Sequence, residues 1–352
     1  MPWLTTKWRR AARQACRNNA TCSRVPRASP SREGERGHPI ARARRTVLLA
    51  LPRVLRGKGR RAPGEKRSVR GARPHGERRK HSVLVAVHVD RSSLMRAAAE
   101  RVVDLAEQAV GARGRFDWAL AGGSTPAQLY SLLASDEFRP RIDWRRVHFF
   151  WGDERCVAPD HAQSNYRMAR LSLLDVVGPP AAHVHRLQGE LEPALAARAY
   201  ERELEEHFEL SVGGGFPRFD LILLGMGADG HTASLFGGTA ALAETRRWVV
   251  DNQVPDLGTV RLTVTLPLLN AAAHVLFLVA GADKAAQLGA VLPAARSLGT
   301  SFAASSGAAG PEEVVPAARV RPSSGELEWL LDASAGALLP RSFPTTATEN
   351  ES

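Results

Sequence analysis

The chain has 352 residues, of which 44% are apolar, so it can form one large domain or two ordinary ones. Its net charge of +12 at pH 7 is typical of nucleic-acid-binding proteins, but the charge is unevenly distributed. Residues 1–80 contain 24 Lys and Arg and 4 Glu, whereas the remaining residues contain 24 basic and 32 acidic side chains. The mildly acidic body is typical of enzymes and argues against nucleic-acid binding by the folded part.

The cysteines argue against a protein held together by disulfides, and the hydropathy argues against a membrane-spanning helix. Cys16, Cys22 and Cys156 provide neither a disulfide framework nor a CxxC metal pair, which fits a reducing cytosol. No stretch reaches the roughly 18 apolar residues that a membrane helix requires. We therefore expect a cytoplasmic protein without a membrane anchor, either a monomer or a homodimer.

Residues 1–81 form a basic extension rich in Arg, Gly, Pro and Ser. We expect this extension to be disordered, because it cannot bury enough apolar surface to offset its ordering entropy. Its composition is compatible with a solvated extension, with a translated stretch that results from a start codon assigned too far upstream, with a nucleic-acid-binding tail, or with a transit peptide. The polar residues 341–352 are expected to form a mobile tail.

An ordered domain is expected over residues 82–340, where apolar runs alternate with segments of helical periodicity. The first helix follows a serine that could cap it, and Pro126 lies in the first turn of the second. Apolar strands that alternate with helices predict a Rossmann-like three-layer α/β sandwich with a mainly parallel sheet. Strands are expected at 82–88, 116–120, 146–151, 219–225, 261–267 and 274–281, and helices at 92–110, 125–135, 165–177, 194–208 and 282–292.

The segment LAGGSTPAQLY passes from a strand end into a helix that begins at Pro126. Gly122 and Gly123 allow an anion to approach the backbone, and the hydroxyls of Ser124 and Thr125 add hydrogen-bond donors. An anion site and a plain helix cap are about equally compatible with this segment alone. It lacks the G-x-G-x-x-G pattern of dinucleotide-binding loops.

Three charged residues follow the strand at 146–151, namely Asp153, Glu154 and Arg155. Ligands of open α/β sheets bind at the carboxyl ends of strands, and an Arg there can bind a phosphate through two N–H groups. A surface ion pair among these neighbours is the simpler interpretation of this segment by itself.

The segment GMGADGHTASLFGG follows the buried strand FDLILL. Its glycines, Gly227 among them, permit a tight loop that approaches a ligand closely. His231 is a candidate general base, and Asp229 is placed to orient its ring. Residues 232–236 are expected to begin a helix, which would favour a neutral imidazole.

Two further cations lie next to strand ends, Arg261 and Lys284, and together with the glycine loop they could neutralise a phosphate. The remaining histidines of the ordered region show no ligand spacing, so they are interpreted as structural and no metal is indicated. These histidines are His148, His183, His185, His207 and His274.

Taken in order, five motifs resemble the 6-phosphogluconolactonase family, which belongs to a superfamily with glucosamine-6-phosphate deaminase. The resemblance covers about residues 83–340, and residues 314–336 are similar to the C-terminal segment of that family. Deaminases typically continue Asp-Gly-His with Ala-Phe-Asn-Glu-Pro and have Asp-Glu-Tyr, whereas this chain has Thr-Ala-Ser-Leu-Phe and Asp-Glu-Arg. The motifs are AGGSTP, GDERCV with SNYRMA, FDLILLGMGADGHTASLF, RLTVTLPLLNAA and LFLVAGADKA.

The resemblance implies hydrolysis of 6-phospho-D-glucono-1,5-lactone to 6-phospho-D-gluconate, without a cofactor. It implies that His231 is the general base, and that phosphate or sugar contacts come from Gly123, Ser124, Thr125, Arg155 and Arg261, with Lys284 a weaker match. Asp153 is a further candidate for contacts to sugar hydroxyls. Two alternatives remain open, a phosphosugar deaminase-isomerase and a non-catalytic phosphosugar-binding regulator with a nucleic-acid-binding tail.

Overall fold

The computed structural model describes residues 83–297 and 315–340, all within the second of two units into which the chain divides, His75–Ser352. The expected basic extension (1–81) and polar tail (341–352) lie outside the described residues. Among the described residues, no helix is long and apolar enough to cross a membrane.

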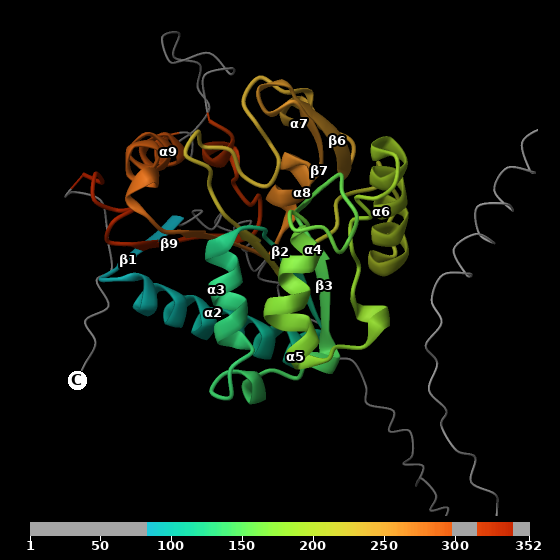
Figure 1. The fold of residues 1–352 in the computed structure, drawn as a ribbon, viewed down its shortest axis with the longest axis horizontal. Helices are drawn as coiled ribbons and strands as arrows, with labels where there is room; N and C mark the ends of the chain where they lie inside the picture. Colours follow the sequence, from blue (N-terminus) through green and yellow to red (C-terminus); the bar gives the residue numbers. More distant parts are fainter. Residues whose placement is uncertain (1–82, 298–314, 341–352) are drawn as a thin grey trace, which may run out of the picture. The chain divides into compact units, whose positions relative to one another are not determined.

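A six-stranded sheet in the order β1-β9-β8-β5-β2-β3 forms the centre of this unit (Figure 1). Every pair of neighbouring strands is parallel, which confirms the predicted mainly parallel sheet. The strands are β1 (Val83–His88), β2 (Phe116–Leu120), β3 (Val147–Trp151), β5 (Leu221–Leu224), β8 (His274–Val279) and β9 (Glu326–Asp332).

The helices that connect these strands cover both faces of the sheet, as two successive residues of β2 show. The Trp118 ring packs against Tyr130 of α3 with 5.9 Å between centroids, whereas the Asp117 carboxylate bonds His207 of α6 at 2.8 Å. Since successive strand residues face opposite sides, α3 and α6 lie on opposite faces, and the three layers follow. The helices are α2 (Arg91–Arg113), α3 (Ser124–Leu133), α4 (Asn165–Ala169), α5 (Asp175–Val177), α6 (Pro193–Phe208), α7 (Ala240–Ala243), α8 (Leu266–Ala271) and α9 (Ala285–Ser297), with a π-helical turn η3 (Arg170–Leu174) between α4 and α5.

Helix α2 shows how local sequence sets element boundaries. Its N-terminus is capped by Asp90, whose carboxylate accepts from the Ser93 backbone N–H at 2.8 Å, so the cap is an aspartate rather than the expected serine. Gly114 ends the helix with φ = 79°, a conformation that favours glycine. Helices α2 and α3 pack together along the sheet (Figure 1).

A second, antiparallel sheet of three strands was not predicted. It has the order β4-β7-β6, with β4 (Asp153–Arg155), β7 (Thr259–Val264) and β6 (Val249–Val254), and α6 packs against it. The predicted strand at 261–267 therefore exists but belongs to this small sheet. Because β4 begins two residues after β3 ends, the small sheet stands directly at the carboxyl edge of the large one.

Candidate active site

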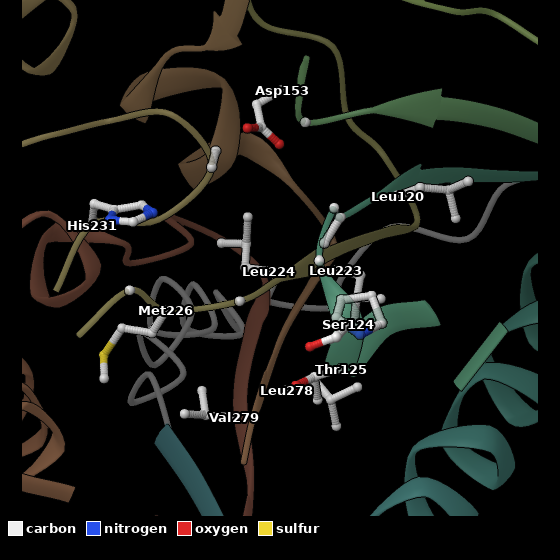
Figure 2. A pocket seen from close by; sticks show the side chains of 18 of the residues that line it. Leu120, Ser124, Thr125, Asp153, Leu223, Leu224, Met226, His231, Leu278 and Val279 are labelled. Atoms are coloured by element: carbon white, nitrogen blue, oxygen red, sulfur yellow. The ribbon is translucent and has the colours of Figure 1, made fainter. Parts of the chain in front are cut away.

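A cavity of about 300 Å³ lies where three parallel strands end (Figure 2). Its lining includes Leu120, Leu224 and Val279, which end β2, β5 and β8. From β2 the chain continues to β3 on one side, whereas from β5 it continues to β8 on the other side. The cavity thus occupies the point where the strand order reverses, which is where open α/β sheets bind their ligands.

The first wall of the cavity is the start of α3. Gly123 is the N-cap residue with φ = 103°, and no side-chain hydrogen bond caps this end of the helix. The first N–H groups of α3 and the hydroxyls of Ser124 and Thr125 therefore remain available to a bound anion. Gly122 packs against Asn165 so closely that a Cβ at this position would collide with the Asn165 side chain. Both glycines are thus required by the geometry of this wall.

The second wall is the loop after β5, which carries His231. Its Nδ1 lies 2.6 Å from Asp229 Oδ1, and the same carboxylate oxygen accepts from the His231 backbone N–H at 3.2 Å. An Nδ1–H that donates to this carboxylate leaves Nε2 with the lone pair, which is the form a base needs. The charge of His231 and its hydrogen bonds outweigh partial burial and lower the pKa of Asp229. Gly227 makes the pair possible, because a Cβ there would overlap both side chains.

The segment after His231 differs from the prediction. Residues 232–236 do not begin a helix but form a turn with a bridge between Thr232 and Leu235, and the next helix is α7. Thr232 donates its hydroxyl to the Gly225 carbonyl at 2.8 Å, and Ala233 has φ = 49°, so the segment turns back on itself. The turn places the Phe236 ring on the His231 imidazole at 4.2 Å between centroids, which holds the ring in place.

Asp153 lines the cavity, yet its two oxygens already bind protein groups. Oδ2 accepts from the Ser234 hydroxyl at 2.7 Å, and Oδ1 accepts from the Asn165 amide at 3.1 Å. The buried carboxylate thus joins the small sheet, α4 and the turn after His231. Its neighbour Glu154 is also buried and accepts from the backbone N–H groups at the start of α4, so it is not part of a surface ion pair. Burial raises the pKa of Glu154.

Three cations lie beside the cavity. Arg155 and Lys284 line it, and Arg261 is the cross-strand partner of Arg155 in the small sheet. Among the described residues, neither guanidinium forms an ion pair, whereas Lys284 Nζ lies 2.9 Å from Asp283 Oδ2. Burial and then the charge of Arg155 lower the pKa of Arg261. Two adjacent guanidiniums without a carboxylate partner are well suited to bind a dianion.

The cavity therefore brings together most of the residues singled out from the sequence. Figure 2 shows His231 on one side, Ser124 and Thr125 on the other, and Asp153 at a third position. Asp229 and Arg261 are not part of the lining. Asp229 is connected to the cavity by its hydrogen bond to His231, and Arg261 by its cross-strand pairing with Arg155. Sequence reasoning missed the supporting roles of Asn165, Ser234 and Phe236, although all three stand inside quoted motifs. The lining residues that were expected are Gly122, Gly123, Ser124, Thr125, Asp153, Arg155, Gly227, His231 and Lys284.

Comparison with known proteins gives consistent matches over the described domain. Residues 89–329 match the family model described as glucosamine-6-phosphate isomerases/6-phosphogluconolactonase. A "6-phosphogluconolactonase" from Nostoc sp. is 40% identical over 257 residues, which are 72% of this chain and 98% of the relative. The solved structure "6-phosphogluconolactonase from Trypanosoma cruzi" superposes with a TM-score of 0.61 at 30% identity, covering 73% of this chain and 97% of that one. A monomeric glucosamine-6-phosphate deaminase shares the fold at 18% identity with a TM-score of 0.56, covering 73% of this chain and 99% of that one.

Proposed function

The chain belongs to the glucosamine-6-phosphate isomerase/6-phosphogluconolactonase family, and we propose that it hydrolyses 6-phospho-D-glucono-1,5-lactone to 6-phospho-D-gluconate, the second step of the oxidative pentose phosphate pathway. The observation that carries this proposal is the His231–Asp229 pair in a cavity whose other wall is an uncapped helix start. A base and an anion site in one cavity suit a phosphorylated substrate whose carbonyl is attacked by water.

His231 acts as the general base. Nε2 takes a proton from a water molecule, and the water oxygen forms a bond to the lactone carbonyl carbon C1. The bond from C1 to the ring oxygen then breaks, and the proton on Nε2 passes to that oxygen. Asp229 stabilises the imidazolium that exists between these two steps, while Phe236 restricts the ring. A single general base of this kind contributes about 10²–10⁴-fold in rate.

The phosphate positions the substrate. We assign its binding to the start of α3, to Lys284 and to the Arg155–Arg261 pair, because these groups supply N–H donors and positive charge beside the cavity. The phosphate lies several bonds from C1, so its binding energy can hold the carbonyl near His231 without taking part in the bond changes. Asp153 fixes the cavity wall between the phosphate-binding groups and His231. The reaction consumes the lactone and one water molecule, and His231 returns to its starting state.

Two observations favour this reaction over the deaminase alternative. The residues after Asp-Gly-His form the Thr-Ala-Ser-Leu-Phe turn, in which Ser234 binds Asp153 and Phe236 stacks on His231. The relative from Nostoc sp. carries the lactonase name at 40% identity, whereas the deaminase likeness at 18% identity shows the fold alone. The regulator alternative gives no reason for a histidine that is oriented by a carboxylate inside the cavity.

Three substrates separate these possibilities. We would follow loss of 6-phosphogluconolactone, generated in situ, against its uncatalysed rate, and in parallel loss of glucono-1,5-lactone and ammonia release from glucosamine 6-phosphate. We expect acceleration with the phosphorylated lactone and much weaker acceleration with the unphosphorylated one. Ammonia release would support the deaminase, and inactivity on all three substrates would favour the regulator.

A further inference from the structure

Four histidines that are far apart in the sequence meet at the opposite end of the strands from the cavity. His148 is the second residue of β3, His183 ends the short helix η4 (Ala181–His183), and His185 follows it. His207 comes from the last turn of α6. The sequence spacing favoured separate structural roles for these residues, but the fold places them in one cluster, called here the histidine cluster.

The rings of the histidine cluster are in direct contact. His148 Nδ1 lies 3.0 Å from His185 Nε2, and the His207 ring centroid lies 4.6 Å from that of His148. One nitrogen each of His148, His185 and His207 lies within 4.8 Å of the other two. The His183 ring stacks on His148 at 3.8 Å, and its buried Nδ1 has no hydrogen-bond partner among the described residues.

Carboxylates on the outer side of the cluster orient two of these rings. Glu203 Oε1 accepts from His185 Nδ1 at 2.8 Å, which leaves the lone pair of His185 on the nitrogen facing His148. Asp117 Oδ1 accepts from His207 Nε2 at 2.8 Å, which leaves a lone pair on Nδ1. Histidines that bind metal ions in proteins almost always donate their other ring N–H in this way, to a carboxylate or a carbonyl.

We propose that His148, His185 and His207 bind a divalent transition-metal ion of the zinc class, with Glu203 and Asp117 orienting the ligands. Imidazole nitrogens suit such ions, and zinc binds them at about 2.0–2.1 Å, so two ligand nitrogens on one zinc lie about 3.3 Å apart. The 3.0 Å between His148 and His185 is close to that separation, and the 4.8 Å limit for the third nitrogen leaves at most about 1.5 Å to close. His183 or water completes the coordination.

The alternative occupant of the gap between His148 and His185 is a proton. A hydrogen bond would need only two rings, however, whereas the cluster gathers four. The ion would tie β3, the edge strand of the large sheet, to the end of α6, so we assign it a structural role that is independent of the proposed lactonase activity.

The test compares zinc binding by the full chain and its variants after chelator treatment. Zn²⁺ is titrated in competition with a chromophoric chelator, using wild type, a triple His148→Gln/His185→Gln/His207→Gln variant, and His274→Gln as a control. His274 is a half-buried histidine beside a carboxylate, outside the cluster. We expect wild type and His274→Gln to bind one more Zn²⁺ per chain than the triple variant. Equal stoichiometry in all three would overturn the proposal.

A second variant pair keeps the test valid if the triple variant does not fold. Glu203→Gln retains all three ligands but weakens the acceptor of His185, and Glu206→Gln changes an exposed residue of the same helix. We expect Glu203→Gln to weaken zinc binding about 10–100-fold, as is typical when such an outer partner is lost, and Glu206→Gln to leave it unchanged. Equal affinity of Glu203→Gln and wild type would contradict the proposal, since a purely structural role of Glu203 would not affect metal binding.

Discussion

Replacing Gly227 by alanine tests whether the position of His231 limits the reaction. A Cβ at Gly227 would lie well inside 3.0 Å of both His231 Nδ1 and Asp229 Oδ1, whereas ordinary van der Waals contacts begin at 3.4 Å. The imidazole must therefore move by about 1 Å, and its 31% exposed side chain leaves room for that movement. A displacement of this size can lower a rate about 10²-fold, so kcat/KM for 6-phosphogluconolactone should fall by about that factor.

The assay needs a control for the added methyl group itself. Gly237 lies in the same loop region, has no heavy atom within 4 Å of an added Cβ, and does not have a left-handed φ. We expect Gly237→Ala to keep wild-type kinetics, and Gly227→Ala to lose activity with a stability cost at the lower end of the usual 1–3 kcal/mol for overpacking. A folded Gly227→Ala enzyme within twofold of wild-type kcat/KM would refute the proposed role of the ring position.

Three further predictions concern the charges of the site and of the fold. Asp229→Asn should lower kcat about 10–100-fold through loss of the charge-assisted hydrogen bond to His231, and initial rates at saturating substrate check this. Arg155→Ala and Arg261→Ala should each raise KM for the phosphorylated lactone about 10–100-fold and leave the hydrolysis of glucono-1,5-lactone unchanged. An equal loss of activity on both substrates would contradict phosphate binding by these two arginines. Glu201→Ala should lower the free energy of unfolding by about 3–5 kcal/mol in urea denaturation, because this buried carboxylate accepts from an arginine and from two backbone N–H groups at the start of β6.

The large sheet could be predicted because its strands carry their own signal. β2 was expected at residues 116–120 and is observed there, since a fully buried strand is apolar over nearly its whole length. β4 could not be predicted, because its sequence Asp-Glu-Arg has no strand pattern and its order depends on pairing with β7. The pairing of Arg155 with Arg261 was equally out of reach, because it arises from a contact between residues about a hundred positions apart.

The candidate site, like the fold, could be predicted only in part. The glycines and the Asp-Gly-His motif predicted the loop and the candidate base, because a close backbone approach and a neutral-pH proton acceptor require particular residue types. The helix expected after His231 was wrong, since the hydrogen bonds of Thr232 and Ser234 to distant groups favour a turn over helix propensity. The histidine cluster gave no signal at all, because its members come from separate elements with no regular spacing.

The most direct test of the account compares wild type and His231→Ala in hydrolysis of 6-phospho-D-glucono-1,5-lactone generated in situ. Under the proposed mechanism, in which His231 supplies the proton transfers, wild type should accelerate the reaction well above the uncatalysed rate, and the folded variant should lose about 10²–10⁴-fold of kcat. A folded His231→Ala variant with wild-type kcat would contradict the assignment of His231 as the general base.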